Sequence, residues 1–208
     1  LDQAEATRRR SLYTDQIKFQ KLDVLNTSPE CGGVDVIIFF NCLSYFPNPE
    51  TVLERYTTLL NPGGRIIMKD SDFGHFLIEP SPMVEIAEIQ ERAKQGNEKQ
   101  SGQFNNFLGR KLYSLSQNAH LGRTYVNVWS YPMFGPLSES EMRYVSGNMQ
   151  YLADQAELVA NDTTTKTWRT VFDPDSNNFL HRKDIFFLMH EIVTVSEPDC
   201  ARREPAEA

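Results

Sequence analysis

Two aspartates and a histidine, Asp70, Asp72 and His75, lie close together shortly after the apolar residues Ile66–Met68. Carboxylates and imidazoles are the side chains that most often take a proton from a reacting hydroxyl or amine. The same residue types bind metal ions, but three potential ligands at this loose spacing do not favour a metal site. We therefore predict that these residues act as general bases or position a polar group of a substrate, with a solvated turn as the alternative.

A second group of polar and aromatic residues follows an earlier apolar run, Val34–Phe40. A run of β-branched and aromatic residues without polar alternation is typical of a strand covered on both faces, as in a parallel sheet. Ligands bind in such sheets beyond the carboxyl ends of the strands. Asn41 there either faces a ligand or makes a turn, whereas Cys42 is more simply a small buried residue than a nucleophile.

The segment between the two groups has the signals of a helix. Asn48 is a suitable N-cap, and Pro49 suits the first helical turn because its missing N–H would have no partner there. Apolar residues follow at helical spacing as far as Leu60, and Pro62-Gly63-Gly64 ends the helix before a second strand, Arg65–Asp70. The segment thus predicts a right-handed βαβ crossover that places both groups at one edge of the sheet.

This pattern, in this order and spacing, resembles strand 4, helix D and strand 5 of the class I S-adenosylmethionine-dependent methyltransferases, in particular bacterial members that act on small molecules. The resemblance implies an α/β, Rossmann-like fold: a mostly parallel sheet with helices on both faces and an antiparallel last strand. It further implies S-adenosylmethionine as cofactor and methyl transfer to an oxygen or nitrogen atom of a small molecule.

The same resemblance indicates which residues meet the cofactor. In the family, an acidic residue after strand 2 binds the ribose and an Asp after strand 3 meets the adenine; Asp2 and Asp23 match these places. Val24, Asn41 and Cys42 complete the expected cofactor contacts. The family's glycine-rich turn is not found before Asp2, so we expect strand 1 and most of strand 2 to be missing from this chain, with a strand from Gln16 to Leu25.

The acceptor pocket is expected to be lined by Tyr45, Phe46, Phe73 and Arg110. Arg110 belongs to a G-R-K-L segment similar to a helix that precedes strand 6 in the family, within an expected amphipathic helix that begins near Phe104. It could bind a carboxylate, although a lone helical arginine is more often part of a surface ion pair. Ser81 and Pro82 predict the start of another helix that ends before Gly96.

The second half of the chain predicts a strand at Arg123–Met133, helices at Ser138–Val159 and Thr163–Phe172, and a last strand at Ile185–Val195. Ser138 and Glu141 have the spacing of a capping box. We expect one domain over residues 1–195, with residues 134–184 as a helical insertion or lid and residues 196–208 as a disordered tail.

Composition narrows the class of partner. A net charge of −7 argues against nucleic acid or an anionic membrane surface, and no apolar run approaches the roughly 20 residues that span a bilayer. The three cysteines form no C-x-x-C pair, which favours reduced thiols in the cytoplasm and no metal centre. A small-molecule acceptor is the expected partner, and an exposed sheet edge would allow a homodimer.

Two other readings remain open. A methyltransferase-like domain without cofactor binding could serve as a scaffold or subunit. A nucleotide-binding oxidoreductase on a similar sheet would need its own glycine fingerprint.

Overall fold

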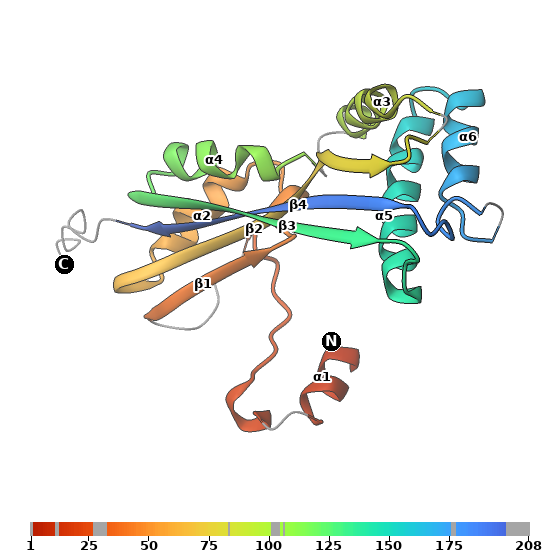
Figure 1. The fold of residues 1–208 in the computed structure, drawn as a ribbon. Coiled ribbons are helices and arrows are strands. Elements are labelled where there is room, and N and C mark those ends of the chain that lie inside the picture. Colours follow the sequence, from red (N-terminus) through yellow and green to blue (C-terminus); the bar gives the residue numbers. More distant parts are fainter. Residues whose placement is uncertain are drawn as a thin grey trace, which may run out of the picture.

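A four-stranded sheet, in the order β1-β2-β4-β3, forms the centre of the computed structural model (Figure 1). Its strands are β1 (Val34–Phe40), β2 (Leu60–Glu79), β3 (Arg123–Phe134) and β4 (Phe186–Glu197). β1 and β2 are parallel, and β4 is antiparallel to both β2 and β3. Three strands therefore share one direction, and the last is reversed, which confirms the expected fold class. The structure describes residues 2–10, 13–26, 33–82, 84–100, 105, 107–175 and 178–198.

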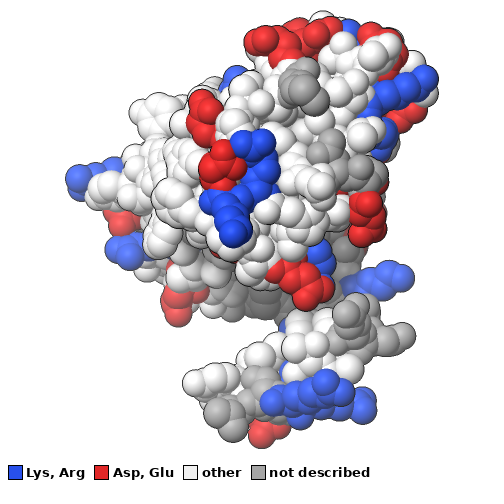
Figure 2. Space-filling model, turned by 45° about the vertical axis from the view of Figure 1, so that its right-hand side comes forward, with Lys and Arg blue, Asp and Glu red and all other residues white. Residues whose placement is uncertain are grey.

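The helices are α1 (Asp2–Arg8), α2 (Pro49–Thr57), α3 (Ile86–Lys99), α4 (Leu112–Asn118), α5 (Glu139–Glu157) and α6 (Thr163–Val171), with short 3-10 turns η1 (Thr14–Gln16), η2 (Leu43–Tyr45) and η3 (Gly109–Lys111). α1 projects from the main body on the β1 side (Figures 1 and 2). Within the described part of the chain, no helix is both long enough and apolar enough to span a bilayer.

The predicted βαβ crossover is present. The side chain of Asn48 caps α2 by accepting a hydrogen bond from the Thr51 N–H, and α2 buries Val52, Leu53 and Tyr56. In the part of the chain that the structure describes, only one face of β1 is covered: Phe39 is buried, but Ile38 and its same-face neighbours Val36 and Phe40 are about half exposed. The expected cover on both faces of this strand is therefore not observed there.

Two apolar clusters make up the core. The first joins β1 and the first half of β2 to α2 and α4, around Leu53, Ile66 and Met68. The second joins the ends of β2 and β4 to α3, α5 and α6 around Trp168, whose indole N–H donates to the Met149 carbonyl at 2.8 Å. β2 and β4 contribute to both clusters and so connect the sheet to the helical part on the right of Figure 1.

The expected helical insertion at residues 134–184 consists of α5, α6 and their connections, and the capping box of α5 is present. α5 packs between α3 and α6. Its buried stripe, which includes Val145, Met149 and Leu152, faces the second cluster.

Several boundaries differ from expectation. The predicted strand from Gln16 to Leu25 is wrong, because these residues form η1 and irregular turns. α3 begins at Ile86 instead of near Ser81 and continues past Gly96 to Lys99. The helix expected from Phe104 is only η3 and α4, and Ser196 belongs to β4, not to a disordered tail; residues 199–208 lie outside the described part.

The largest difference concerns β2, which continues through Asp70, Asp72 and His75 to Glu79. Its second half pairs with β4 from Phe186 to Met189, after an irregularity between Ser71 and Phe76. This pairing is contributed by a strand more than 100 residues later in the sequence. Asp70 and Asp72 are therefore strand residues and not loop carboxylates.

The close contact between α3 and α5 depends on Gly96. A Cβ atom at this position would lie 1.9 Å from the Gln155 carbonyl oxygen. We expect Gly96→Ala to lower the free energy of unfolding by about 1–3 kcal/mol in urea denaturation, because the helices must separate. Gly147→Ala is the control: it lies in α5 with no atom near its Cβ position, and better helix propensity should raise stability by about 0.5–1 kcal/mol. Equal stability of the Gly96→Ala variant and the native chain would refute the close-contact argument.

Candidate active site

Asp70 is the most unusual carboxyl near the carboxyl end of β1, and it lies in the middle of β2. It is 4% exposed; its Oδ1 accepts the Ser71 N–H at 3.0 Å, whereas its Oδ2 makes no hydrogen bond to any described residue. Burial raises the pKa of Asp70 to about 6, and the nearby polar hydrogens of Ser71 and Ser44 offset this only in part. Asp70 is thus a stronger base than an ordinary aspartate.

Cys42 lies beside this carboxyl. Its own burial and the charge of Asp70 raise the pKa of the thiol to about 11. The thiol therefore stays protonated at neutral pH, which agrees with the expectation that Cys42 is not a nucleophile.

Asn41 makes the turn at the end of β1. Its φ is 50°, in the left-handed region that asparagine tolerates, and its N–H donates to the Lys69 carbonyl at 2.9 Å. Its exposed side chain remains at the edge where a ligand would approach. The turn role and the ligand-facing role are therefore compatible.

Asp72 and Arg110 form a closely bonded pair. Asp72 is fully buried and accepts three hydrogen bonds from Arg110: from the backbone N–H at 2.9 Å, from Nε at 2.7 Å and from Nη2 at 2.7 Å. The Gly74 N–H donates a fourth. The hydrogen bond to Asp72 raises the pKa of Arg110. Asp72, expected as a base, has its oxygens occupied by these donors and instead fixes the direction of Arg110.

Gly74 allows this arrangement. A Cβ atom there would lie 1.9 Å from Arg110 Nη2, so a larger residue would displace the guanidinium. His75 follows on β2 as an exposed residue. Since it points into solvent on a strand, it is a weaker candidate for a base than Asp70.

The four residues expected to line the acceptor pocket fall in different environments. Phe73 is buried, with its ring 5.8 Å from that of Tyr151. Tyr45 is 59% exposed, and its proximity, together with burial, raises the pKa of Tyr151. Phe46 packs against the first cluster. Of the four, Phe73 and Phe46 pack in the two clusters, Tyr45 is exposed, and Arg110 lines a hollow.

Asp23 closes a turn next to α2. Its carboxylate accepts hydrogen bonds from the Leu25 N–H and the Asn26 side chain, which lower its pKa, and Val24 packs against the first cluster. The guanidinium of Arg55 holds the turn by donating to the Leu25 carbonyl at 2.5 Å. The side chain of Asp2, at the start of α1, lies outside the described part.

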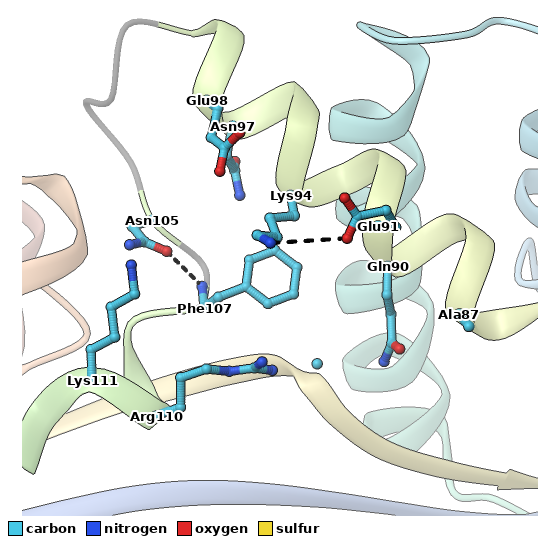
Figure 3. Close-up of a pocket in the computed structure, with 11 residues that line it drawn as sticks. Ala87, Gln90, Glu91, Lys94, Asn97, Glu98, Asn105, Phe107, Arg110 and Lys111 are labelled. Atoms are coloured by element: carbon cyan, nitrogen blue, oxygen red, sulfur yellow. Dashed lines mark hydrogen bonds and ion pairs between the residues drawn. The ribbon is translucent and has the colours of Figure 1, made fainter.

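Two hollows adjoin these residues. The smaller, about 310 Å³, is lined by Leu25, Pro47, Asn48, Thr51, Val52 and Arg55. The larger, about 590 Å³, lies between α3 and Arg110 (Figure 3). Sequence analysis found Arg110 but not Phe107, Lys111 or the α3 residues of this hollow, because only long-range packing of α3 against β2 brings them together.

Comparison with known proteins gives a consistent result. A family model described as a methyltransferase domain matches residues 1–124. The methyltransferase Str3 of Strobilurus tenacellus is 30% identical over 175 residues, which cover 72% of this chain and 55% of that protein. The chain thus spans about half the length of this relative.

Solved structures also match over most of the chain, at low sequence identity and with TM-scores below 0.5. A Bacillus halodurans protein described as a methyltransferase has a TM-score of 0.48 at 10% identity, over 88% of this chain and 78% of that one. Coclaurine N-methyltransferase bound to N-methylheliamine and S-adenosylhomocysteine has a TM-score of 0.43 at 12% identity, over 93% and 56%.

The Asp72–Arg110 pair should contribute more to stability than an exposed pair of the same geometry. Asp72→Asn should cost about 1–3 kcal/mol of unfolding free energy, because a buried charge-assisted network loses its anion. The matched control is Asp184→Asn, since Asp184 accepts from Nε and Nη2 of Arg182 at the surface; because solvent screens this exposed pair, the substitution should cost clearly less than Asp72→Asn. Equal costs in urea denaturation would contradict a special role for the buried pair.

The raised pKa of Asp70 should make stability depend on pH. Between about pH 4 and pH 6 the unfolded carboxyl ionises while the folded one keeps its proton, so stability falls as pH rises through this window, by up to about 3 kcal/mol. Asp70→Asn should remove this component and be more stable than the native chain at pH 7. The two proteins are compared in parallel urea titrations. The prediction is refuted if the difference between their unfolding free energies stays the same from pH 4 to pH 7.

Proposed function

Since the chain belongs to the methyltransferase domain family, whose cofactor is S-adenosylmethionine, we propose that it transfers a methyl group to an oxygen or nitrogen atom of a small molecule. The buried carboxyl of Asp70 is the observation that supports an oxygen or nitrogen atom as the methyl acceptor. An O–H or N–H acceptor loses a proton when it is methylated, and a base is then needed near the carboxyl edge of the sheet.

The residues at this edge fit the cofactor. The small hollow beside the Asp23 turn has an apolar wall of Leu25, Pro47 and Val52, as a flat heterocycle requires. We assign Asp23 and Val24 to the adenosine end, with Asn41 and Cys42 along the edge of β1 and Asp2 as the ribose contact implied by the family resemblance. When bound, the cofactor supplies a methyl group on a positively charged sulfur, which is already a strong electrophile.

The chain's own residues then orient the acceptor and remove its proton. Asp70 takes the proton on its oxygen, and a pKa of about 6 leaves the carboxylate largely ionised at neutral pH while making it more basic than usual. Phe73 and Tyr45 limit the access of water, and the Arg110 guanidinium, fixed by Asp72, positions a polar group of the acceptor. Asp72 and His75 remain weaker candidates for the base, for the geometric reasons given above.

The proposal is tested on the natural full-length protein that contains this chain. We expect S-adenosylhomocysteine to bind with micromolar affinity in calorimetric titration, both to this protein and to its Asp70→Asn variant. The variant should lower kcat by about 10²–10⁴-fold, since a positioned base contributes this much. The rate is measured by mass spectrometry of the product, with an acceptor found by screening small phenols, acids and amines.

The outcomes separate the alternatives. A folded protein that does not bind S-adenosylhomocysteine would overturn the enzyme assignment and leave a scaffold. Cofactor binding with unchanged kcat in Asp70→Asn would keep the methyltransferase and overturn the role of Asp70. Asp184→Asn is the control for a surface carboxylate. It should leave both the affinity for S-adenosylhomocysteine and kcat unchanged.

A further inference from the structure

The larger hollow lies beside the site and is not explained by cofactor binding. One wall is α3, which contributes Ala87, Gln90, Glu91, Lys94, Asn97 and Glu98. The opposite wall consists of Gly74 in β2 and of Asn105, Phe107, Arg110 and Lys111. In Figure 3 the Arg110 guanidinium enters from below and the Lys94 ammonium from above, with the Phe107 ring between them.

Arg110 presents an unused edge to this hollow. Of its five side-chain N–H groups, one on Nε and one on Nη2 are bound to Asp72. Nη1 makes no hydrogen bond to any described residue, and the side chain is 46% exposed although its partner Asp72 is completely buried. The Asp72 carboxylate therefore occupies one side of the guanidinium and directs the other toward the hollow.

The surroundings favour a flat ligand with one negative charge. The Arg110 guanidinium lies over the Phe107 ring, 5.6 Å from its centre, so a ligand bound to the guanidinium would lie close to an aromatic side chain that also lines the hollow. Lys94 is 4.0 Å from Glu91, and Glu98 adds a second carboxylate to the α3 wall. With Lys94, Arg110 and Lys111 against these two carboxylates, the lining carries one net positive charge, which suits a monoanion such as a planar carboxylate on the two-pronged edge of arginine better than a dianion such as a phosphate monoester.

We propose that this hollow binds the methyl acceptor through a carboxylate on Arg110, with an aromatic ring of the acceptor against Phe107. The inference rests on the proposed function and specifies its substrate class as aromatic carboxylic acids. Asp70 and Asp72 are two positions apart on one face of β2, which places them about 7 Å apart. Arg110 is bonded to Asp72, so an acid held by Arg110 would bind next to the part of β2 that carries Asp70.

The experiment measures binding to the natural full-length protein by ligand-observed NMR. The probes are benzoate, phenylacetate and 4-hydroxybenzoate, each compared with its neutral amide and with phenyl phosphate, in the presence of S-adenosylhomocysteine. We expect at least one carboxylate to bind at least tenfold more tightly than its amide and than phenyl phosphate. Arg110→Gln should remove this preference, while Arg182→Gln, which breaks the equivalent surface pair, should keep it.

Two further variants separate binding from folding. Arg110→Lys keeps the charge but loses the two-pronged edge, so it should weaken carboxylate binding at least fivefold. The double variant Asp72→Asn/Arg110→Gln leaves no unpaired buried charge, and it should bind S-adenosylhomocysteine normally but no carboxylate.

The inference is overturned if no carboxylate binds, if acids and amides bind equally, if phenyl phosphate binds most tightly, or if Arg110→Gln keeps the preference. In each case, retained S-adenosylhomocysteine binding shows that the methyltransferase assignment itself stands. If the native protein itself does not bind S-adenosylhomocysteine, the proposed function is refuted instead.

Discussion

The antiparallel pairing of β2 with β4 is the constraint on which the rest of the structure depends. The two long strands pass through both apolar clusters, so the sheet with α2 and α4 cannot move independently of α3, α5 and α6. The same pairing keeps β2 extended through Asp70 and Asp72, in a region where a turn would have exposed both carboxylates. Burial of these side chains is therefore a consequence of a strand contributed by the far end of the sequence.

The two aspartates on this face of β2 differ in their hydrogen bonding and in their pKa. Asp72 is surrounded by N–H donors and makes a fixed ion pair, whereas Asp70 has a raised pKa and an oxygen that makes no hydrogen bond to any residue that the structure describes. The difference arises from what lies near each residue: η3 brings the Arg110 side chain to Asp72, whereas Ser44 in η2 and Cys42 just before it lie near Asp70. In the proposed function, Asp72 therefore orients the cation that holds the acceptor, and Asp70 takes the proton.

Local signals predicted much of this arrangement. The apolar run of β1, the Asn48 cap and the Ser138–Glu141 capping box each act within a few residues, and each was found where the sequence placed it. The extension of β2, the α3 wall of the larger hollow and the pairing of Asp72 with Arg110, 38 positions apart, depend on contacts between distant segments. Periodicity carries no information about such contacts, so the residue types were identified but the different environments of Asp70 and Asp72 were not.

The environment of Cys42 also bears on the chemical durability of the site. Only the thiolate form of cysteine reacts rapidly with alkylating agents and oxidants. With a pKa of about 11, the thiolate fraction at pH 7 is on the order of 10⁻⁴, so modification is slow while the edge of β1 stays packed. The sulfur next to the proposed base is thereby protected from oxidation, and the rate at which it is labelled reports how often this edge of the sheet opens.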